Sequence, residues 1–161
     1  VKAYKHENKY FKAGLKSLHF IIETSPITEV DSVFNLFIQK NDIPVDASGC
    51  SNGVFVGESP YDAYDYKHVI TIQIENEKII LVDYNEINKS DIGKEEDLNY
   101  NEEMKVSGTS PSIAYPIMEE QLLETQNMNK VDAVSGATYS LYRFRYALAI
   151  ALMKARINNL K

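Results

Sequence analysis

The sequence predicts an α+β protein in which a small antiparallel sheet packs with helices and follows an N-terminal helical extension. Three observations lead to this fold class. Apolar residues recur at helical spacing before residue 45 and again after residue 138, and they alternate with polar residues between positions 70 and 84. The chain has 161 residues, a length that favours one folded domain with an appended element. We therefore expect a helical extension over residues 1–49 and a domain over residues 50–161.

Residues 1–45 are expected to form two short helices packed as a hairpin. Two sets of apolar residues have the spacing of one buried helix face, and the segment TSPIT interrupts them. The first set is Phe11, Leu15, Leu18 and Ile22, and the second is Val30, Val33, Phe34, Phe37 and Ile38.

From residue 50 onward the pattern changes to that of a sheet. The segment GVFVGE, residues 53–58, follows turn-forming residues and predicts a short strand. Ile70, Ile72 and Ile74 alternate with polar residues, the segment ENEK breaks the run, and residues 79–84 resume it. This arrangement predicts a β-hairpin. The polar stretch that follows, residues 85–106, is expected to be a surface loop or a partial helix.

Two more helices are expected near the C-terminus. Ser110 followed by Pro111 is typical of a helix start, and Pro116 marks either the true start or a kink. The last helix should follow the segment VSGAT. Its expected buried stripe consists of Leu141, Phe144, Leu148, Leu152 and Ala155.

Composition disfavours several classes of function. Seventeen basic and 23 acidic side chains give a net charge of −6, which argues against nucleic acid as a partner. No apolar run approaches the ~20 residues needed to span a bilayer. We expect membrane contact only through an anchor outside the given sequence.

The chain shows no recognisable catalytic or metal-ligating pattern. Cys50 is the single cysteine, so an intramolecular disulfide and a multi-cysteine metal site are excluded. The histidines, His6, His19 and His68, have no metal-ligand spacing. We also find no nucleophile–base arrangement and no phosphate-binding glycine loop. No metal site and no catalytic residue are therefore predicted.

The segment VDAVSGATYS, residues 131–140, stands directly before the last helix. Ser135 is expected to cap that helix, which places Thr138 near its third position, among N–H groups without intrahelical partners. A helix N-terminus attracts phosphate, so a phosphoester on Thr138 would be stabilised there. A role in helix capping alone would also explain the four residues SGAT, residues 135–138.

The string DAVSGAT resembles the flavinylation motif of the FMN-binding domain family, Asp-x-x-Ser/Thr-Gly-Ala-Thr. That family includes a flavin-carrying component of the Na⁺-translocating NADH:quinone reductase, its counterpart in the Rnf complex, and secreted flavoproteins of Gram-positive bacteria. In the family a flavin transferase takes FMN from FAD and esterifies its phosphate to the motif's last threonine. The resemblance implies that Thr138 is the covalent FMN acceptor and that Asp132, Ser135, Gly136 and Ala137 are motif positions. It extends over residues 53–161 and assigns the domain of residues 50–161 to FMN binding.

Two further segments are expected to contact the flavin. The loop before the hairpin carries Tyr61, Tyr64 and Tyr66, which could stack on an isoalloxazine ring or could belong to a tyrosine-rich surface loop. This loop is richer in Asp and poorer in Gly than is usual in the family. Gly108 and Thr109, in the turn VSGTSP, could contact the flavin or its phosphate, and the alternative is a second capping motif.

The sequence thus favours an electron-transfer flavoprotein domain, a redox carrier rather than a stand-alone enzyme. The resemblance implies an extracytoplasmic location, a flavin transferase for maturation, and a redox partner protein or a quinone- or NADH-linked complex. Two alternatives stay open: a non-covalent FMN-binding or sensory module, and an interaction protein without flavin.

Overall fold

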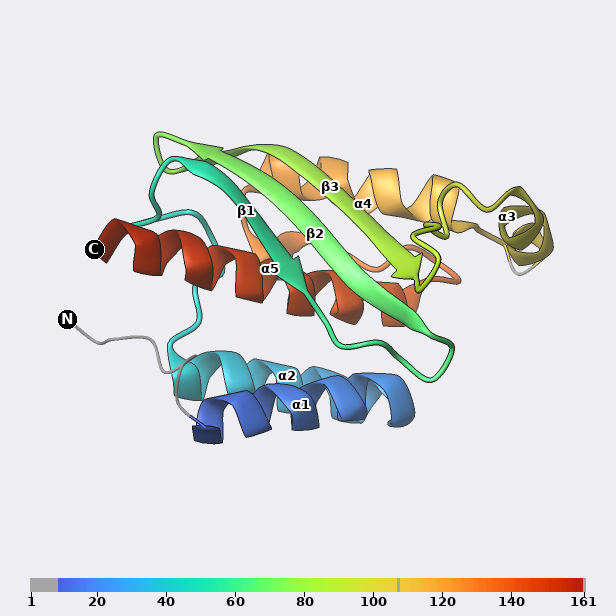
Figure 1. The fold of residues 1–161 in the computed structure, drawn as a ribbon, viewed down its shortest axis with the longest axis horizontal. Helices are drawn as coiled ribbons and strands as arrows, with labels where there is room; N and C mark the ends of the chain where they lie inside the picture. The colour runs from blue at the N-terminus through green and yellow to red at the C-terminus, as the bar shows by residue number, and fades with distance from the viewer. Residues whose placement is uncertain (1–8, 107, 161) are drawn as a thin grey trace.

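A computed structural model describes residues 9–106 and 108–160 of the chain and confirms the α+β class. The described residues form five α-helices and one antiparallel sheet of strand order β1-β2-β3 (Figure 1). Within this part of the chain, none of the helices has the length and apolar character needed to cross a membrane. The strands are β1 (Gly53–Glu58), β2 (Tyr66–Glu75) and β3 (Lys78–Asn88), and the helices are α1 (Lys9–Thr24), α2 (Ile27–Asn41), α3 (Leu98–Lys105), α4 (Pro111–Thr125) and α5 (Thr138–Leu160).

The predicted hairpin is present as β2 and β3, joined by the two residues Asn76 and Glu77. Both turn residues have positive φ angles, 50° and 59°, as a type I′ turn requires. The alternating isoleucines Ile70, Ile72 and Ile74 are fully buried on one face. Both strands are longer than predicted because their polar ends remain paired, out to the pair of Tyr66 with Asn88.

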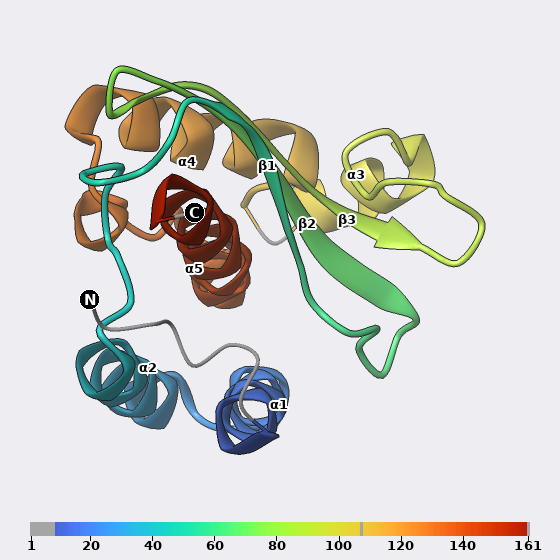
Figure 2. The same cartoon turned by 60° about the vertical axis from the view of Figure 1, so that its left-hand side comes forward.

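Helix α5 lies at the centre of the molecule, between the sheet and the hairpin of α1 and α2 (Figures 1 and 2). Its predicted stripe is confirmed, since all five of those residues are buried. The contact with β1 is close. A Cβ atom at Gly57 would overlap the carbonyl oxygen of Ala147, so only glycine allows this approach. The sheet therefore buries its inner face directly against the last helix.

The predicted helical hairpin is confirmed for the described residues, and residues 1–8 lie outside them. Ile22, Val30 and Phe34 are its buried anchors. Hydroxyl groups along one side of α5 also hold it. The Tyr142 hydroxyl donates to Asp31 Oδ1 at 2.6 Å, and the Tyr146 hydroxyl donates to the carbonyl of Leu15 at 3.3 Å. The N-terminal helices thus pack against the last helix of the chain.

The polar segment after β3 turns back beside the end of that strand, where the Lys94 N–H donates to the Glu86 carbonyl at 2.8 Å, and then continues beyond the sheet (Figure 1). It contains α3, whose N-terminus is capped by Asp97, which accepts from the Tyr100 N–H at 3.0 Å. Helix α4 begins at Pro111, so Pro116 lies inside the helix and does not mark its start. A short 3₁₀ turn at Met128–Lys130 then leads toward α5.

Candidate functional site

The residues before α5 form a tight turn. The Ala137 N–H donates to the Val134 carbonyl at 2.8 Å, and Gly136 has φ 85°, the geometry of a type II turn that favours glycine at this place. Helix α5 begins at Thr138. The prediction that Ser135 caps the helix and that Thr138 is its third residue is therefore wrong. The reason is that Ser135 and Gly136 are the two central residues of the turn, so the helix begins only at Thr138, which is exposed.

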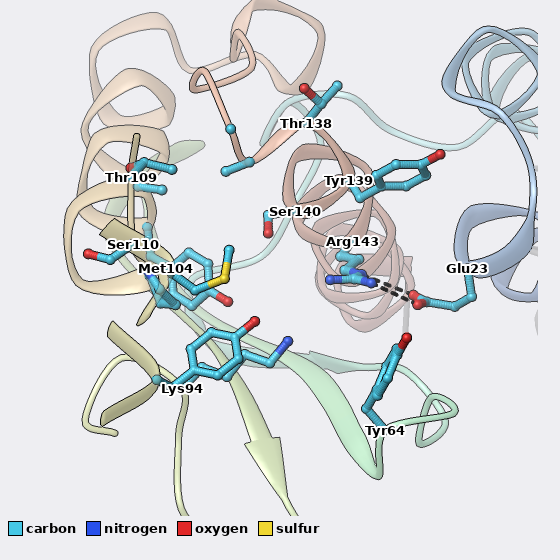
Figure 3. A pocket seen from close by; sticks show the side chains of 16 residues that line it. Glu23, Tyr64, Lys94, Met104, Thr109, Ser110, Thr138, Tyr139, Ser140 and Arg143 are labelled. Carbon is cyan, nitrogen blue, oxygen red and sulfur yellow. Dashed lines mark hydrogen bonds and ion pairs between the residues drawn. The ribbon is translucent and has the colours of Figure 1, made fainter. Parts of the chain in front are cut away.

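Thr138 stands at a cavity of about 330 Å³, a volume at the lower end of the range for small-molecule sites. The cavity brings together segments that are far apart in the sequence. Of the predicted site residues, Gly136, Ala137, Thr138, Tyr64 and Thr109 line it (Figure 3). The other lining residues are Glu23, Lys94, Tyr100, Met104, Ser110, Pro111, Ala114, Tyr115, Tyr139, Ser140 and Arg143.

Thr109 is the best-placed member of the second predicted segment. Its side chain is 4% exposed, and its hydroxyl oxygen has no hydrogen-bond partner within the described residues. A buried hydroxyl without a partner requires an explanation, and a bound ligand is one. The neighbouring Gly108 is exposed and does not line the cavity.

The remaining predicted residues lie outside the cavity. Asp132 and Ser135 are exposed, and the Asp132 N–H donates to Gln121 Oε1 at 2.7 Å. Tyr61 is 41% exposed and lies near the ammonium groups of two lysines. Tyr66 does not line the cavity, but its ring lies 4.6 Å from the ammonium group of Lys94, which does. Direct contact with a ligand in this cavity is therefore expected of Tyr64 but not of Tyr61 or Tyr66.

The floor of the cavity is a buried charge network centred on Glu86. Glu86 is fully buried. Its carboxylate accepts from Lys94 Nζ at 3.0 Å, from Arg143 Nη1 at 3.2 Å and from the Tyr115 hydroxyl at 2.7 Å. Burial opposes ionisation, but the charges of Arg143 and Lys94 outweigh it and lower the pKa of Glu86 to about 2. Glu86 is therefore a carboxylate that holds two cations at the cavity.

Arg143 connects this floor to the helical hairpin. Its Nη2 donates to Glu23 Oε2 at 2.9 Å and its Nε to Glu23 Oε1 at 3.1 Å, a bidentate pair between α5 and α1 (Figure 3). Despite burial, hydrogen bonds from His68 and Arg143 lower the pKa of Glu23 to about 2. The region expected to be an extension without chemistry thus supplies a carboxylate to the cavity wall.

Two histidines adjoin the same carboxylate. His68 Nε2 lies 2.9 Å from Glu23 Oε1, and His19 Nε2 lies 3.9 Å from it. The two imidazole rings are 5.5 Å apart between centroids. Burial, followed by the charge of His68, lowers the pKa of His19. The structure therefore brings together two histidines that have no ligand spacing in the sequence, while His6 lies outside the described residues.

Sequence reasoning missed the charged residues of the cavity, namely Glu23, Glu86, Lys94 and Arg143. One of them carries a local signal, since Glu86 occupies the position two residues after the buried Tyr84 on β3. A charge at a position that periodicity assigns to the core is rarely left unpaired. Glu23, Lys94 and Arg143 carry no comparable signal.

The cavity offers features that suit a phosphorylated aromatic ligand. Lys94 and Arg143 provide N–H donors, Tyr64, Tyr100 and Tyr115 provide aromatic surface, and the Thr109 hydroxyl is unpartnered within the described residues. Thr138 adds an exposed hydroxyl at the start of a helix, where phosphate is favoured. These residues fit a ligand with a phosphate and a flat aromatic ring.

Comparison with known proteins identifies relatives but no family model, since none matches the chain. The chain is similar to the 15 kDa lipoprotein of Treponema pallidum (strain Nichols), with 31% identity over 97 residues, which cover 60% of this chain and 69% of that protein. It is also similar to the crystal structure of the CPE2226 protein of Clostridium perfringens, with a TM-score of 0.64 and 32% identity over 68% of this chain and 91% of that chain. A solution structure from Clostridium thermocellum aligns with a TM-score of 0.42 and 22% identity, covering 69% of this chain and 93% of that one.

Proposed function

The chain belongs to the family of the 15 kDa lipoprotein of Treponema pallidum, and from this premise and the cavity we propose that it is an electron-transfer flavoprotein domain carrying FMN on Thr138. One observation carries the proposal. Thr138, the acceptor that the DAVSGAT motif singles out, is exposed at a cavity shared with Thr109 and Tyr64. Those two residues were expected at a flavin site from separate parts of the sequence.

The attachment step is a phosphoryl transfer at Thr138. The Thr138 oxygen forms a bond to the phosphorus of the FMN moiety while the pyrophosphate bond of FAD breaks and AMP leaves. The hydroxyl proton passes to a base on the flavin transferase. The unpaired N–H groups of the first turn of α5 stabilise the phosphoester that results. Gly136 and Ala137, which have little or no side chain, allow the transferase to approach.

The cavity residues would hold and tune the ring. The flavin supplies the redox chemistry when bound. Lys94 and Arg143, both held by Glu86, would offer N–H donors to the polar edge of the ring. Tyr64 and Tyr100 offer ring faces for stacking, and the Thr109 hydroxyl offers a donor.

We propose an extracytoplasmic location, with a redox partner protein or a quinone- or NADH-linked complex as the electron partner. The description of the Treponema relative as a lipoprotein supports a location at the outer face of a membrane. The surplus of acidic side chains favours a partner with a basic surface.

The test is intact mass and in-gel flavin fluorescence after co-expression with a flavin transferase. We expect a mass gain equal to FMN less one water, which is lost in Thr138→Ala. Ser140→Ala is the matched control, because it removes a hydroxyl that lines the same cavity without touching the acceptor. Flavin that is present in the native protein but absent after denaturation would instead favour the non-covalent module. No flavin in either sample would favour the interaction protein.

A further inference from the structure

Behind the cavity wall, α1 and β2 bring three potential metal-ligand atoms together. His19 and Glu23 are one helical turn apart on α1, and His68 lies opposite them on β2. Their donor atoms all lie within 4.8 Å of one another. Nothing in this arrangement depends on FMN or on Thr138.

The condition of the two histidines indicates a ligand. His19 is 7% exposed, and its Nε2, which faces Glu23, has no hydrogen-bond partner within the described residues. His68 is fully buried. The distance of 3.9 Å between His19 Nε2 and Glu23 Oε1 is too long for a hydrogen bond, but a cation between the two atoms can bridge it.

The surroundings supply outer contacts of the kind that orient metal ligands. His68 Nε2 lies 2.9 Å from Glu23 Oε1, and its Nδ1 lies 3.8 Å from the buried Glu86 Oε1. Metal binding at Nε2 would leave the ring proton on Nδ1, on the side of Glu86. Arg143 Nη2 holds Glu23 Oε2 at 2.9 Å, which directs Oε1 toward the imidazoles. Arg143 Nε also contacts Oε1, and metal binding would release that contact while the bond from Nη2 remains.

We propose that His19, Glu23 and His68 bind a divalent transition-metal ion of the zinc type. Two imidazoles and one carboxylate are a donor set that suits Zn²⁺ better than Mg²⁺ or Ca²⁺, which prefer oxygen ligands. Tetrahedral ligands about 2.0–2.1 Å from zinc lie roughly 3.3 Å apart. The separations of 2.9 Å and 3.9 Å from Glu23 lie on either side of that value, and all three donor atoms are within 4.8 Å of one another, so side-chain rotations would have to close the remaining gaps around the ion.

The charge balance of the region favours a cation. Glu23 and Glu86 pair with the cations of Arg143 and Lys94. The Asp62 carboxylate lies beside His68 and Glu86, which leaves one negative charge when both imidazoles are neutral. Asp62 Oδ2 is itself buried without a hydrogen-bond partner within the described residues. The ion would link α1 to β2 and so fasten the helical hairpin to the sheet beside the cavity.

The probe is Co²⁺, added to chelator-treated protein from which any affinity tag has been removed. We expect one Co²⁺ per chain, visible absorption bands typical of four-coordinate Co²⁺, and displacement of Co²⁺ by Zn²⁺. His19→Gln should weaken binding by at least about tenfold. Glu29→Gln, at an exposed position of α2, is the control for loss of a negative charge and should bind as the unsubstituted protein does.

Two results would overturn the proposal: no stoichiometric Co²⁺ binding, or binding by His19→Gln equal to that of the unsubstituted protein. A second measurement needs no variant. Zinc should shift the Nε2 resonances of His19 and His68 in ¹⁵N spectra of the imidazoles, and spectra without such shifts would reject the site even if His19→Gln failed to fold.

Discussion

Replacing Arg143 by methionine tests the buried charge network directly. Methionine replaces the unbranched stem of the arginine side chain but removes the guanidinium that pairs with both Glu86 and Glu23. Glu86 is fully buried and keeps Lys94, whereas the side chain of Glu23 is 11% exposed and keeps the imidazoles of His19 and His68. Removing one partner of a buried pair typically costs about 3–5 kcal/mol. We therefore expect the free energy of unfolding to fall by about 3–5 kcal/mol at pH 7.

The measurement is urea denaturation, with thermal unfolding beside it. For a chain of this length, 1 kcal/mol shifts the melting temperature by roughly 2–4 °C, so a decrease of roughly 6–20 °C is expected. Arg156→Met on the same helix is the control. Arg156 contacts the Ser48 carbonyl and lies 4.0 Å from the partly exposed Asp46, so its loss should cost about 1 kcal/mol or less.

The pH dependence gives a sharper check on Arg143→Met. The folded-state pKa values of Glu23 and Glu86 are about 2, below their ordinary value of 4.5. Their contribution to stability is therefore present above pH 4.5 and is lost as the pH falls toward 2. Without Arg143 these pKa values rise, so the free energy of unfolding of the variant should come closer to that of the unsubstituted protein at about pH 3.5 than at pH 7. A loss below about 1 kcal/mol at pH 7, or an equal loss at both pH values, would refute the reasoning.

Two further predictions concern the packing of α4 and of β1. Burial raises the pKa of Glu119 to about 7, although a hydrogen bond from the Tyr84 N–H at 2.7 Å opposes the shift. The protonated carboxyl therefore contributes stability below pH 4.5, and this contribution is lost as the pH rises through 7. The free energy of unfolding of Glu119→Gln should therefore equal that of the unsubstituted protein near pH 4 and exceed it by about 1–3 kcal/mol at pH 8, as measured by urea denaturation. A difference that does not change with pH would contradict this. Gly57→Ala should lower the free energy of unfolding by about 2–4 kcal/mol, because its Cβ would overlap the Ala147 carbonyl oxygen on α5. Gly14→Ala, in the interior of α1, is the control and should be close to neutral in the same assay, because its Cβ would meet only the edge of the Phe37 ring and alanine favours the helix.

The sequence predicted the elements of the fold well because each has a local periodic signal. The isoleucines of β2 and the stripe on α5 alternate or repeat at the spacing of their element, and both are buried as expected. The strand ends were missed because Tyr66 and Asn88 carry no such signal, although they pair in the sheet. The start of α5 was misplaced because Ser135 suits both a helix cap and a turn, and the glycine after it selects the turn.

The candidate site could be predicted only in part. The motif singled out Thr138 and the turn residues before it, Tyr64 came from the loop that the family has before the hairpin, and Thr109 came from a second glycine- and hydroxyl-containing turn before a helix. The charge network could not be predicted, because Glu23 and Arg143 are paired across most of the chain and neither has a local pattern that indicates its partner. Lys94 looked solvated within a polar stretch, but the rings of Tyr66 and Tyr100 lie over its ammonium group.

The central position of α5 has a consequence for biosynthesis. The strands are synthesised before α5, yet the inner row of Ile70, Ile72 and Ile74 packs toward this helix, which follows every other described element in the chain. Such non-local contacts form slowly, because a long loop must close before they become favourable. The inner face of the sheet therefore cannot pack against α5 until residues 138–160 have left the ribosome. Thr138 meets Glu23, Tyr64 and Thr109 at the cavity only at that point, so the proposed flavin transferase would act on the folded surface and not on a nascent chain.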